Sequence, residues 1–224
     1  MTVPTSVTRQ GSDAHPWVVM GGTFDPIHYG HLRSAFELLN LLEIPTLHFM
    51  PTGQPYHRPA QFAPNALRVR MLEAAIQEEP RFAIDERELN RPGPSYTIDS
   101  LEELRVEHPR QSICFVVGLD AFLTMPHWHR ADELLTQAHV IVVHRPGFLV
   151  PEDGVLKTWL DDHQTTHVAD LRHETHGRIY LHEVTPLAIS STAIRTLLKN
   201  GQDPQFLLPS AVRAIISEHR CYSN

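Results

Sequence analysis

Residues 17–32 read WVVMGGTFDPIHYGHL, and this stretch decides the fold. Its first four residues form a short apolar run, which is typical of a buried strand. The run leads directly into the turn-rich segment Gly21–Pro26, and from about Tyr29 apolar residues return at helical spacing. The stretch therefore predicts a strand, a glycine-rich loop and a helix in immediate succession.

The predicted loop has the properties of an anion site. Gly21 and Gly22 carry no Cβ, so a ligand can approach their backbone amides closely. The helix that follows directs its free amides and the positive end of its dipole toward the same place. His28 and His31 share a face of the first helical turn and can donate hydrogen bonds to phosphate oxygens. Paired glycines are also common in ordinary α/β turns, and a histidine is often only bound to a neighbour, so a purely structural role stays open.

Strands and helices alternate along the rest of the chain. Apolar runs predict five more strands, near residues 47–50, 82–84, 113–117, 140–143 and 179–184. The alternation predicts an α/β fold, namely a Rossmann-like doubly wound, mainly parallel sheet with helices on both faces. Four loops follow strands and are expected to converge on one rim: 21–31, 51–58, 118–129 and 185–195.

The pattern also divides the chain into regions. Residues 1–15 are polar and irregular and predict a loose N-terminal tail. Residues 16–224 are expected to form a single domain, which includes C-terminal helices from about residue 190. Within it, residues 147–177 are polar and weakly patterned and could form a surface excursion, so their role stays open.

The composition and net charge restrict the kinds of partner that the protein is expected to bind. The 224 residues carry a formal net charge of −7, whereas a general nucleic-acid surface needs a basic balance. The sequence predicts a soluble, cytoplasmic protein with no membrane partner. It has only two cysteines, its first residues do not resemble a secretory signal, and its apolar runs are too short to span a bilayer. Sixteen histidines include no HExxH or Cys/His zinc pattern, so no metal-ligating set is predicted. A homo-oligomer stays possible.

A second anion site is predicted near the C-terminus. The sequence Ser190-Ser191-Thr192 begins a helix, and its hydroxyls and free amides can surround a phosphate. Arg195 lies one turn further on, and its planar guanidinium can hold a phosphate with two hydrogen bonds. The alternative is an ordinary serine N-cap followed by a surface arginine.

Three loop residues have a functional and a structural interpretation. Trp128 can stack on a pyridine ring or anchor its own loop. Asp120 can accept hydrogen bonds from a ribose or cap a helix. Arg58 can bind a phosphate or remain a solvated loop charge.

The string GGTFDPIHYGHL contains the HxGH signature of the nucleotidyltransferase superfamily and closely resembles the opening motif of nicotinate mononucleotide adenylyltransferases. Further segments resemble motifs of that family in the family's order: PTGQPYHR at 51–58, REL at 87–89, PSYT at 94–97, GLD at 118–120, PHW at 126–128, HRPG at 144–147 and ISSTAIR at 189–195. Tyr56 stands where the family has a second proline, and His129 stands where relatives often have tyrosine. Both departures leave the local conformation or contact open.

The resemblance implies roles for individual residues. His28, His31 and Arg195 would be catalytic. The ATP-binding set would comprise these three and Gly21, Gly22, Thr23, Phe24, Gly118, Asp120, Arg145, Ser190, Ser191 and Thr192. The mononucleotide-binding set would comprise Thr23, Phe24, Arg58, Tyr96, Thr97, Trp128 and His129.

The implied reaction transfers the adenylyl group of ATP to nicotinate mononucleotide and releases pyrophosphate, in NAD biosynthesis. Mg²⁺ would be carried mainly by the ATP phosphates. Three alternatives remain: a sister transferase acting on nicotinamide mononucleotide, phosphopantetheine or glycerol phosphate; a class I aminoacyl-tRNA synthetase; and a catalytically silent nucleotide-binding regulator. The short, acidic chain without a KMSKS-like loop disfavours the synthetase.

Overall fold

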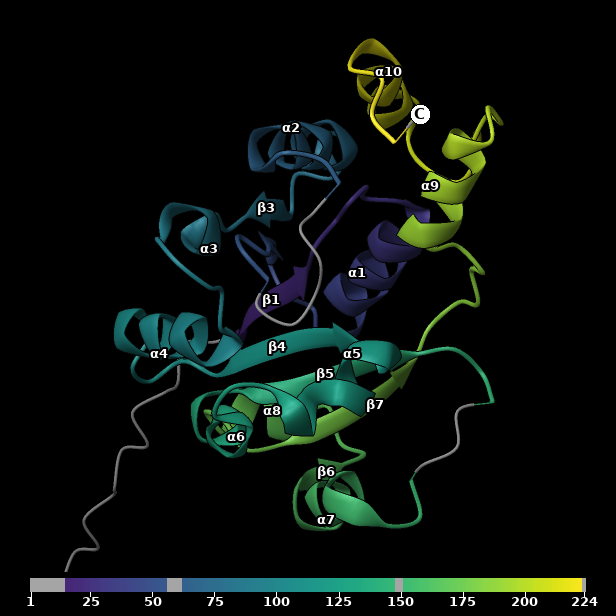
Figure 1. The fold of residues 1–224 in the computed structure, drawn as a ribbon. Coiled ribbons are helices and arrows are strands. Elements are labelled where there is room, and N and C mark those ends of the chain that lie inside the picture. Colours follow the sequence, from purple (N-terminus) through teal and green to yellow (C-terminus); the bar gives the residue numbers. More distant parts are fainter. Residues whose placement is uncertain (1–14, 56–61, 148–150, 223–224) are drawn as a thin grey trace, which may run out of the picture.

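A single parallel sheet organises the molecule (Figure 1). The computed structural model describes residues 15–55, 62–147 and 151–222, so the predicted N-terminal tail lies almost entirely outside the described residues. All strand pairs are parallel, in the order β3-β2-β1-β4-β5-β7-β6. The strands are β1 (Trp17–Gly22), β2 (Leu47–Pro51), β3 (Phe82–Ile84), β4 (Ile113–Gly118), β5 (His139–His144), β6 (Gln164–Thr165) and β7 (Ile179–Glu183).

Helices connect the strands, as the alternating pattern predicts. They are α1 (Tyr29–Leu41), α2 (Asn65–Ile76), α3 (Arg87–Asn90), α4 (Thr97–Glu107), α5 (Leu119–Thr124), α6 (Leu134–Gln137), α7 (Gly154–His163), α8 (Asp170–His173), α9 (Ser191–Lys199) and α10 (Ser210–Glu218). Two single-turn 3₁₀ helices, Met125–His127 and Ala131–Glu133, lie between α5 and α6.

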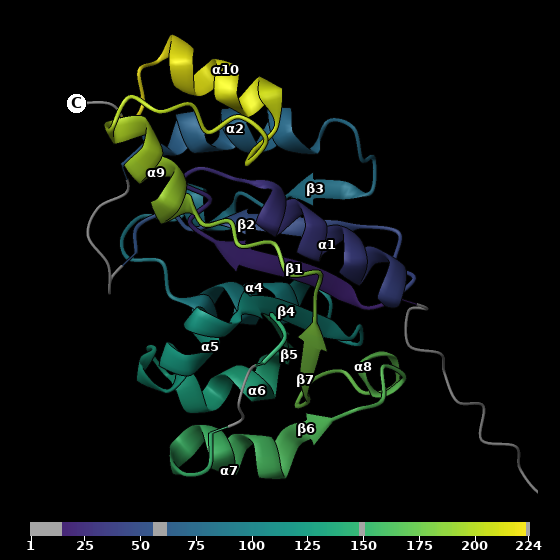
Figure 2. The same ribbon diagram turned by 90° about the vertical axis from the view of Figure 1, so that its right-hand side faces the viewer.

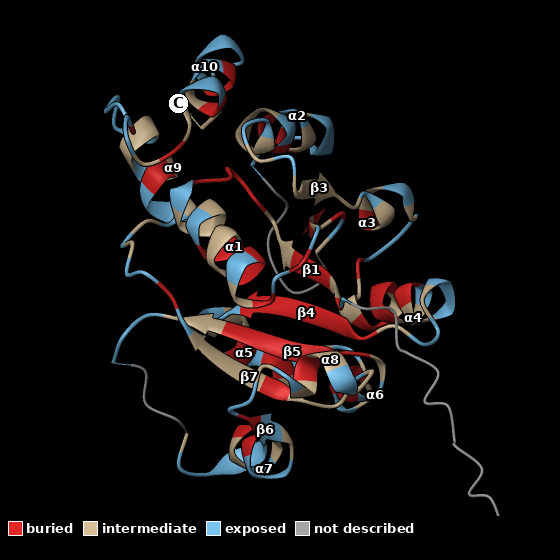
Figure 3. Ribbon diagram, turned by 180° about the vertical axis from the view of Figure 1, so that it is seen from behind, coloured by how far each residue is buried: buried red, intermediate tan, exposed pale blue. Residues whose placement is uncertain are grey.

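Alternate residues of the central strands face two separate cores. Val18 and Met20 of β1 pack into one core, which receives buried side chains from α1, α2, α8, α9 and α10. Val19 packs into the other, which receives side chains from α4, α5, α6 and α7. This alternation is the two-residue period of a strand, and because both faces are covered the strands read as continuous apolar runs. Figure 3 shows β4 and β5 almost entirely buried. The predicted doubly wound fold with helices on both faces is confirmed.

The segment 147–177, which by its sequence could be a surface excursion, is part of the packed fold over most of its described length. It contains α7, α8 and the edge strand β6, which pairs with β7. Leu171 of α8 is fully buried in the first core, and Leu160 of α7 is buried in the second. The segment therefore completes the sheet.

The strand order has a topological switch point beside β1, where a ligand crevice can form. From β1 the chain moves outward to β2 and β3, then returns to the other side of β1 with β4 and continues to β5. Loops after β1 and β4 leave neighbouring strands at such a switch, and ligands of doubly wound sheets bind there. Figure 2 shows α5 and α9 at this same end of the sheet.

Candidate active site

The loop after β1 requires its glycines because other side chains lie against them. A Cβ added to Gly21 would lie 2.8 Å from Cε2 of Phe115, and one added to Gly22 would lie 2.9 Å from Cζ of Phe24. Real Cβ atoms do not approach carbon this closely, so any other residue would displace a ring. Phe24 itself has a left-handed backbone with φ of 46° and is buried. The loop is therefore held by its own aromatic side chain.

Two histidine rings stack at the start of α1. His28 is the N-cap residue, and its ring centroid lies 3.7 Å from that of His31 with 20° between the planes. A Cβ on Gly30 would lie 2.9 Å from Cε1 and Nδ1 of His28, so glycine makes room for the ring. The edge of Phe24 meets His31 with 5.1 Å between the centroids. Both Nδ1 atoms are buried and have no hydrogen-bond partner among the described residues.

Burial keeps this histidine pair uncharged at neutral pH. Loss of solvent, aided by the positive charge of Arg145, lowers the pKa of His28 to about 4. Loss of solvent and the neighbouring His28 hold the pKa of His31 well below its usual range. A bound polyanion would act in the opposite direction, because a nearby negative charge favours the imidazolium form. The pair can therefore donate hydrogen bonds to an anion and gain positive charge as negative charge accumulates.

Side chains from distant segments hold the carbonyl groups of the same loop. Arg68 of α2 donates to the Thr23 carbonyl at 2.6 Å, and Arg195 of α9 donates to the Asp25 carbonyl at 2.7 Å. Ser191 donates to the Pro26 carbonyl at 2.9 Å. These bonds tie the loop after β1 to α2 and α9.

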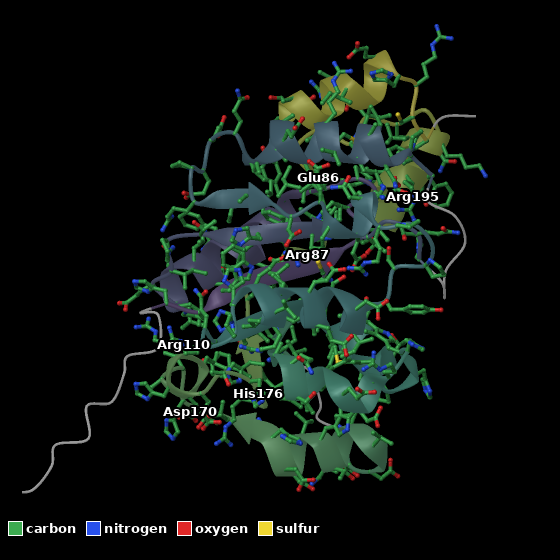
Figure 4. All side chains as sticks on the ribbon, turned by 90° about the vertical axis from the view of Figure 1, so that its left-hand side faces the viewer. Glu86, Arg87, Arg110, Asp170, His176 and Arg195 are labelled. Atoms are coloured by element: carbon green, nitrogen blue, oxygen red, sulfur yellow. The ribbon has the colours of Figure 1, made fainter. Side chains whose placement is uncertain are left out.

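The predicted second anion site lies against the first. The Ser190 hydroxyl caps α9 by accepting from the Ala193 amide at 3.2 Å. Arg195 also donates to the Thr192 hydroxyl at 3.1 Å and lies over the Phe62 ring at 4.4 Å. In Figure 4, Arg195 lies at the opposite end of the sheet from Arg110, Asp170 and His176. Arg145 reaches the Ile189 carbonyl at 3.4 Å. The ordinary serine cap is thus present together with an arginine directed at the first loop.

A cavity opens beside the two loops. Its volume is about 100 Å³, and its lining includes four residues of the predicted mononucleotide set, Thr23, Thr97, Trp128 and His129, and both loop glycines. The remaining lining residues are Met50, Thr52, Pro55, Glu88, Ser95, Phe115, Val117 and Ala121. Trp128 meets Phe115 edge to face with 6.4 Å between ring centroids. An aromatic residue thus stands in a largely apolar cavity with few polar groups, as binding sites for small ring systems require.

The other predicted residues differ in their relation to this cavity. Tyr96 is the N-cap residue of α4, and its ring lies 4.2 Å from that of His129. Gly118 and Asp120 are exposed where β4 passes into α5 and do not line the cavity. Arg58, with Tyr56, lies outside the described residues.

Sequence reasoning missed Glu88 and Ser95 as lining residues. Glu88 is buried and accepts a hydrogen bond from the Ser100 hydroxyl at 3.1 Å, and burial raises the pKa of its carboxyl group. Ser95 accepts from the Gln54 amide at 2.9 Å. Both belong to segments that resemble family motifs, REL and PSYT, which was the available signal.

Two further observations concern metals and membranes. In the described residues there is no group of three or more His, Cys, Asp or Glu side chains that could hold a metal ion. No helix within the described ranges is both long and apolar enough to cross a membrane.

Because His139 is buried, the free energy of unfolding is expected to depend on pH. The Arg178 amide donates to its Nδ1 at 3.0 Å, and its Nε2 lies 3.0 Å from the Glu174 carbonyl, so the ring is neutral with the proton on Nε2. Burial lowers its pKa to about 4. The unfolded chain takes up this proton near its ordinary value, so the free energy of unfolding should fall as pH drops from 6.5 toward 4, by ~1.4 kcal/mol per pH unit for this residue.

Urea unfolding at about pH 7, 5.5 and 4.5 measures the effect. His28 acts in the same direction, because its pKa is also lowered to about 4. His139→Asn keeps an acceptor near the Arg178 amide but cannot titrate, so its stability should depend less steeply on pH. A free energy of unfolding that is constant over this range in the unmodified protein would contradict the prediction.

Comparison of the sequence with known proteins shows to which family the chain belongs. The Methylococcus capsulatus protein named "Probable nicotinate-nucleotide adenylyltransferase" is 44% identical over 206 residues, covering 92% of this chain and 98% of that protein. The chain belongs to the nicotinate-nucleotide adenylyltransferase family. Relatives of the same name from Aeromonas hydrophila and Escherichia coli are 43% and 41% identical, and the chain covers 97% of each. The resemblance seen in the motifs is confirmed.

Two further comparisons concern the broader family and the fold. The cytidylyltransferase-like family model matches residues 19–197. A solved structure described as Plasmodium falciparum nicotinic acid mononucleotide adenylyltransferase complexed with NaAD has a TM-score of 0.72 at 18% identity, with 93% of this chain and 97% of that chain covered. The same protein complexed with APC gives a TM-score of 0.70. At this identity the likeness shows the fold.

Proposed function

We propose that the protein transfers the adenylyl group of ATP to nicotinate mononucleotide, giving nicotinate adenine dinucleotide and pyrophosphate. The observation that carries the proposal is the stacked pair His28–His31 beside a cavity lined by Trp128. The two Nδ1 atoms have no hydrogen-bond partner within the described part of the chain. The pair suits a polyphosphate and the cavity suits an aromatic ring. The names given to the relatives support this assignment.

The cavity is proposed to receive the pyridine ring of the mononucleotide. Its volume of about 100 Å³ is below the ~300–1,000 Å³ of pockets that enclose a whole drug-sized ligand, so a single ring enters and the ribose phosphate extends toward the loops. Trp128 would stack on the ring, and Thr97 and His129 would receive its carboxylate through backbone amides. Tyr96 would support His129, and Arg58 would bind the mononucleotide phosphate.

ATP is proposed to lie across the first loop and the start of α9. Gly21, Gly22, Thr23 and Phe24 would contact it through the backbone, since the side chain of Phe24 is buried. Ser190, Ser191, Thr192 and Arg195 would bind the leaving phosphates. Gly118, Asp120 and Arg145, at the exposed end of β4 and after β5, would contact the adenosine.

The reaction depends more on aligning the mononucleotide phosphate with the α-phosphorus of ATP than on activating the nucleophile. The mononucleotide phosphate attacks the α-phosphorus in line, a new P–O bond forms, and the bond to the β-phosphate breaks. The nucleophile is already anionic, so no covalent intermediate is required. His28, His31 and Arg195 would stabilise the charge that accumulates on the departing pyrophosphate. Mg²⁺ would be carried by the ATP phosphates, because Mg²⁺ prefers oxygen ligands, whereas the groups of the site are mainly imidazoles, amides and a guanidinium.

Direct assay tests the proposal. Purified protein is incubated with ATP and Mg²⁺ and with either nicotinate or nicotinamide mononucleotide, and dinucleotide and pyrophosphate are measured. We expect equal amounts of both products and a strong preference for the nicotinate substrate. Equal rates would contradict the proposed selectivity of the cavity, and no dinucleotide from either would contradict the proposed function.

A further inference from the structure

The C-terminal segment returns to the first loop. After α10 ends at Glu218, Arg220 and Tyr222 take left-handed backbones with φ of 47° and 65°, which turn the chain back toward the sheet. The Tyr222 hydroxyl then donates to Oδ1 of Asp25 at 2.5 Å. In Figure 2 the described chain that follows α10 ends beside α9, at the end of the sheet where the loops converge. Two residues 197 positions apart in the chain thus meet at the candidate active site.

Asp25 joins three segments by its carboxylate. It is buried, and besides Tyr222 it accepts from the Phe62 amide at 2.7 Å and the Ala63 amide at 3.2 Å. Its own carbonyl accepts from Arg195. It does not line the cavity. Its side chain therefore fixes the loop from behind, between the residues that follow β2 and those that follow α10.

The environment keeps the tyrosine in its donating form. Burial and the carboxylate of Asp25 raise the pKa of Tyr222 far above its usual range, so the hydroxyl retains its proton. A buried carboxylate needs all of its donors, because an unmet acceptor in a water-poor environment is costly. Among the described residues, removing the hydroxyl would leave Asp25 with the backbone donors of residues 62–63.

We propose that Tyr222 is a positioning residue, which holds the loop after β1 through Asp25 so that His28, His31 and Arg195 converge on one ligand. This rests on the proposed function only for its kinetic consequence. Tyr222 lies away from the cavity lining, so its loss should affect alignment of the phosphates more than capture of the mononucleotide. Displacements of a fraction of an ångström are enough to slow a reaction that depends on alignment.

Tyr222→Phe tests the proposal, with Tyr180→Phe on β7 as the matched control. We expect Tyr222→Phe to lower kcat about tenfold, with KM for nicotinate mononucleotide within about twofold. Hydrogen–deuterium exchange of peptides covering residues 20–31 should become about tenfold faster, since loss of the bond favours local opening. Tyr180→Phe should leave kcat, KM and the exchange rate of residues 20–31 unchanged.

Hydrogen exchange separates the two proposals. If the unmodified protein forms no dinucleotide but Tyr222→Phe still accelerates exchange in residues 20–31, the positioning role stands and the assigned activity falls. If exchange and kcat both stay within twofold of the unmodified protein, the positioning role is overturned. Asp25→Asn probes the same contact from the loop side, should Tyr222→Phe fail to fold; unchanged exchange in that variant would equally overturn the role.

Discussion

His31→Ala is expected to lower kcat by ~10²-fold or more, the usual cost of removing one preorganised donor from developing charge. The imidazole stacks on His28, is covered by the edge of Phe24, and has a buried Nδ1 without a partner among the described residues. Such a group has no structural hydrogen bond at that atom to lose. The measurement is steady-state turnover of ATP and nicotinate mononucleotide.

The matched control for this substitution is His173→Ala, an exposed histidine in α8. It should leave turnover unchanged. His31→Ala also removes an aromatic contact, so circular dichroism and the thermal midpoint are needed to show that the variant is folded. Near-normal turnover by folded His31→Ala would remove this residue from the mechanism.

Arg68→Met is expected to lower the free energy of unfolding by ~3–5 kcal/mol, the cost of breaking a buried charged network. Arg68 is fully buried. Its guanidinium donates to the carbonyls of Thr23 and Thr52, each at 2.6 Å, and to Oδ1 of Asn65 at 2.8 Å. Methionine fills much of the volume but removes the charged donor from part-buried carbonyls of the loops after β1 and β2. Urea unfolding at neutral pH measures the difference.

Arg70→Met provides the comparison within the same helix. Arg70 is half-exposed and pairs with Glu218 at 3.0 Å, so its replacement should cost less than ~1 kcal/mol. Arg68→Lys should resemble Arg68→Met more than the unmodified protein, because one ammonium group cannot reproduce the fork that joins two loops. Equal losses at Arg68 and Arg70 would show that burial of the guanidinium has no special role.

The central strands and the histidine pair could be predicted because their signals are local. Val18 and Val19 belong to a short apolar run that ends in two glycines, and His28 and His31 are three residues apart at the start of a helix. Each of these patterns spans only a few neighbouring residues. Their structural outcome depends little on what the rest of the molecule does.

Contacts between distant segments could not be predicted. Arg68 reads as one of two arginines in an amphipathic helix, and only the packing of α2 shows that it is the buried one. The pairing of Tyr222 with Asp25 has no sequence signal at all. Strand β6 has two residues, Gln164 and Thr165, and neither is apolar enough to indicate a strand; its place is set by the neighbouring β7.

The bond between Tyr222 and Asp25 also orders events during synthesis of the chain. Tyr222 leaves the ribosome 197 residues after Asp25, so in the nascent polypeptide the Asp25 carboxylate lacks this donor until the segment after α10 has been made. Domains fold as their parts emerge, and the strands from β1 to β7 can pair before that donor arrives. The contact between Tyr222 and the loop after β1 can therefore form only after these strands are available to pair, so the sheet can precede the final fixing of this loop.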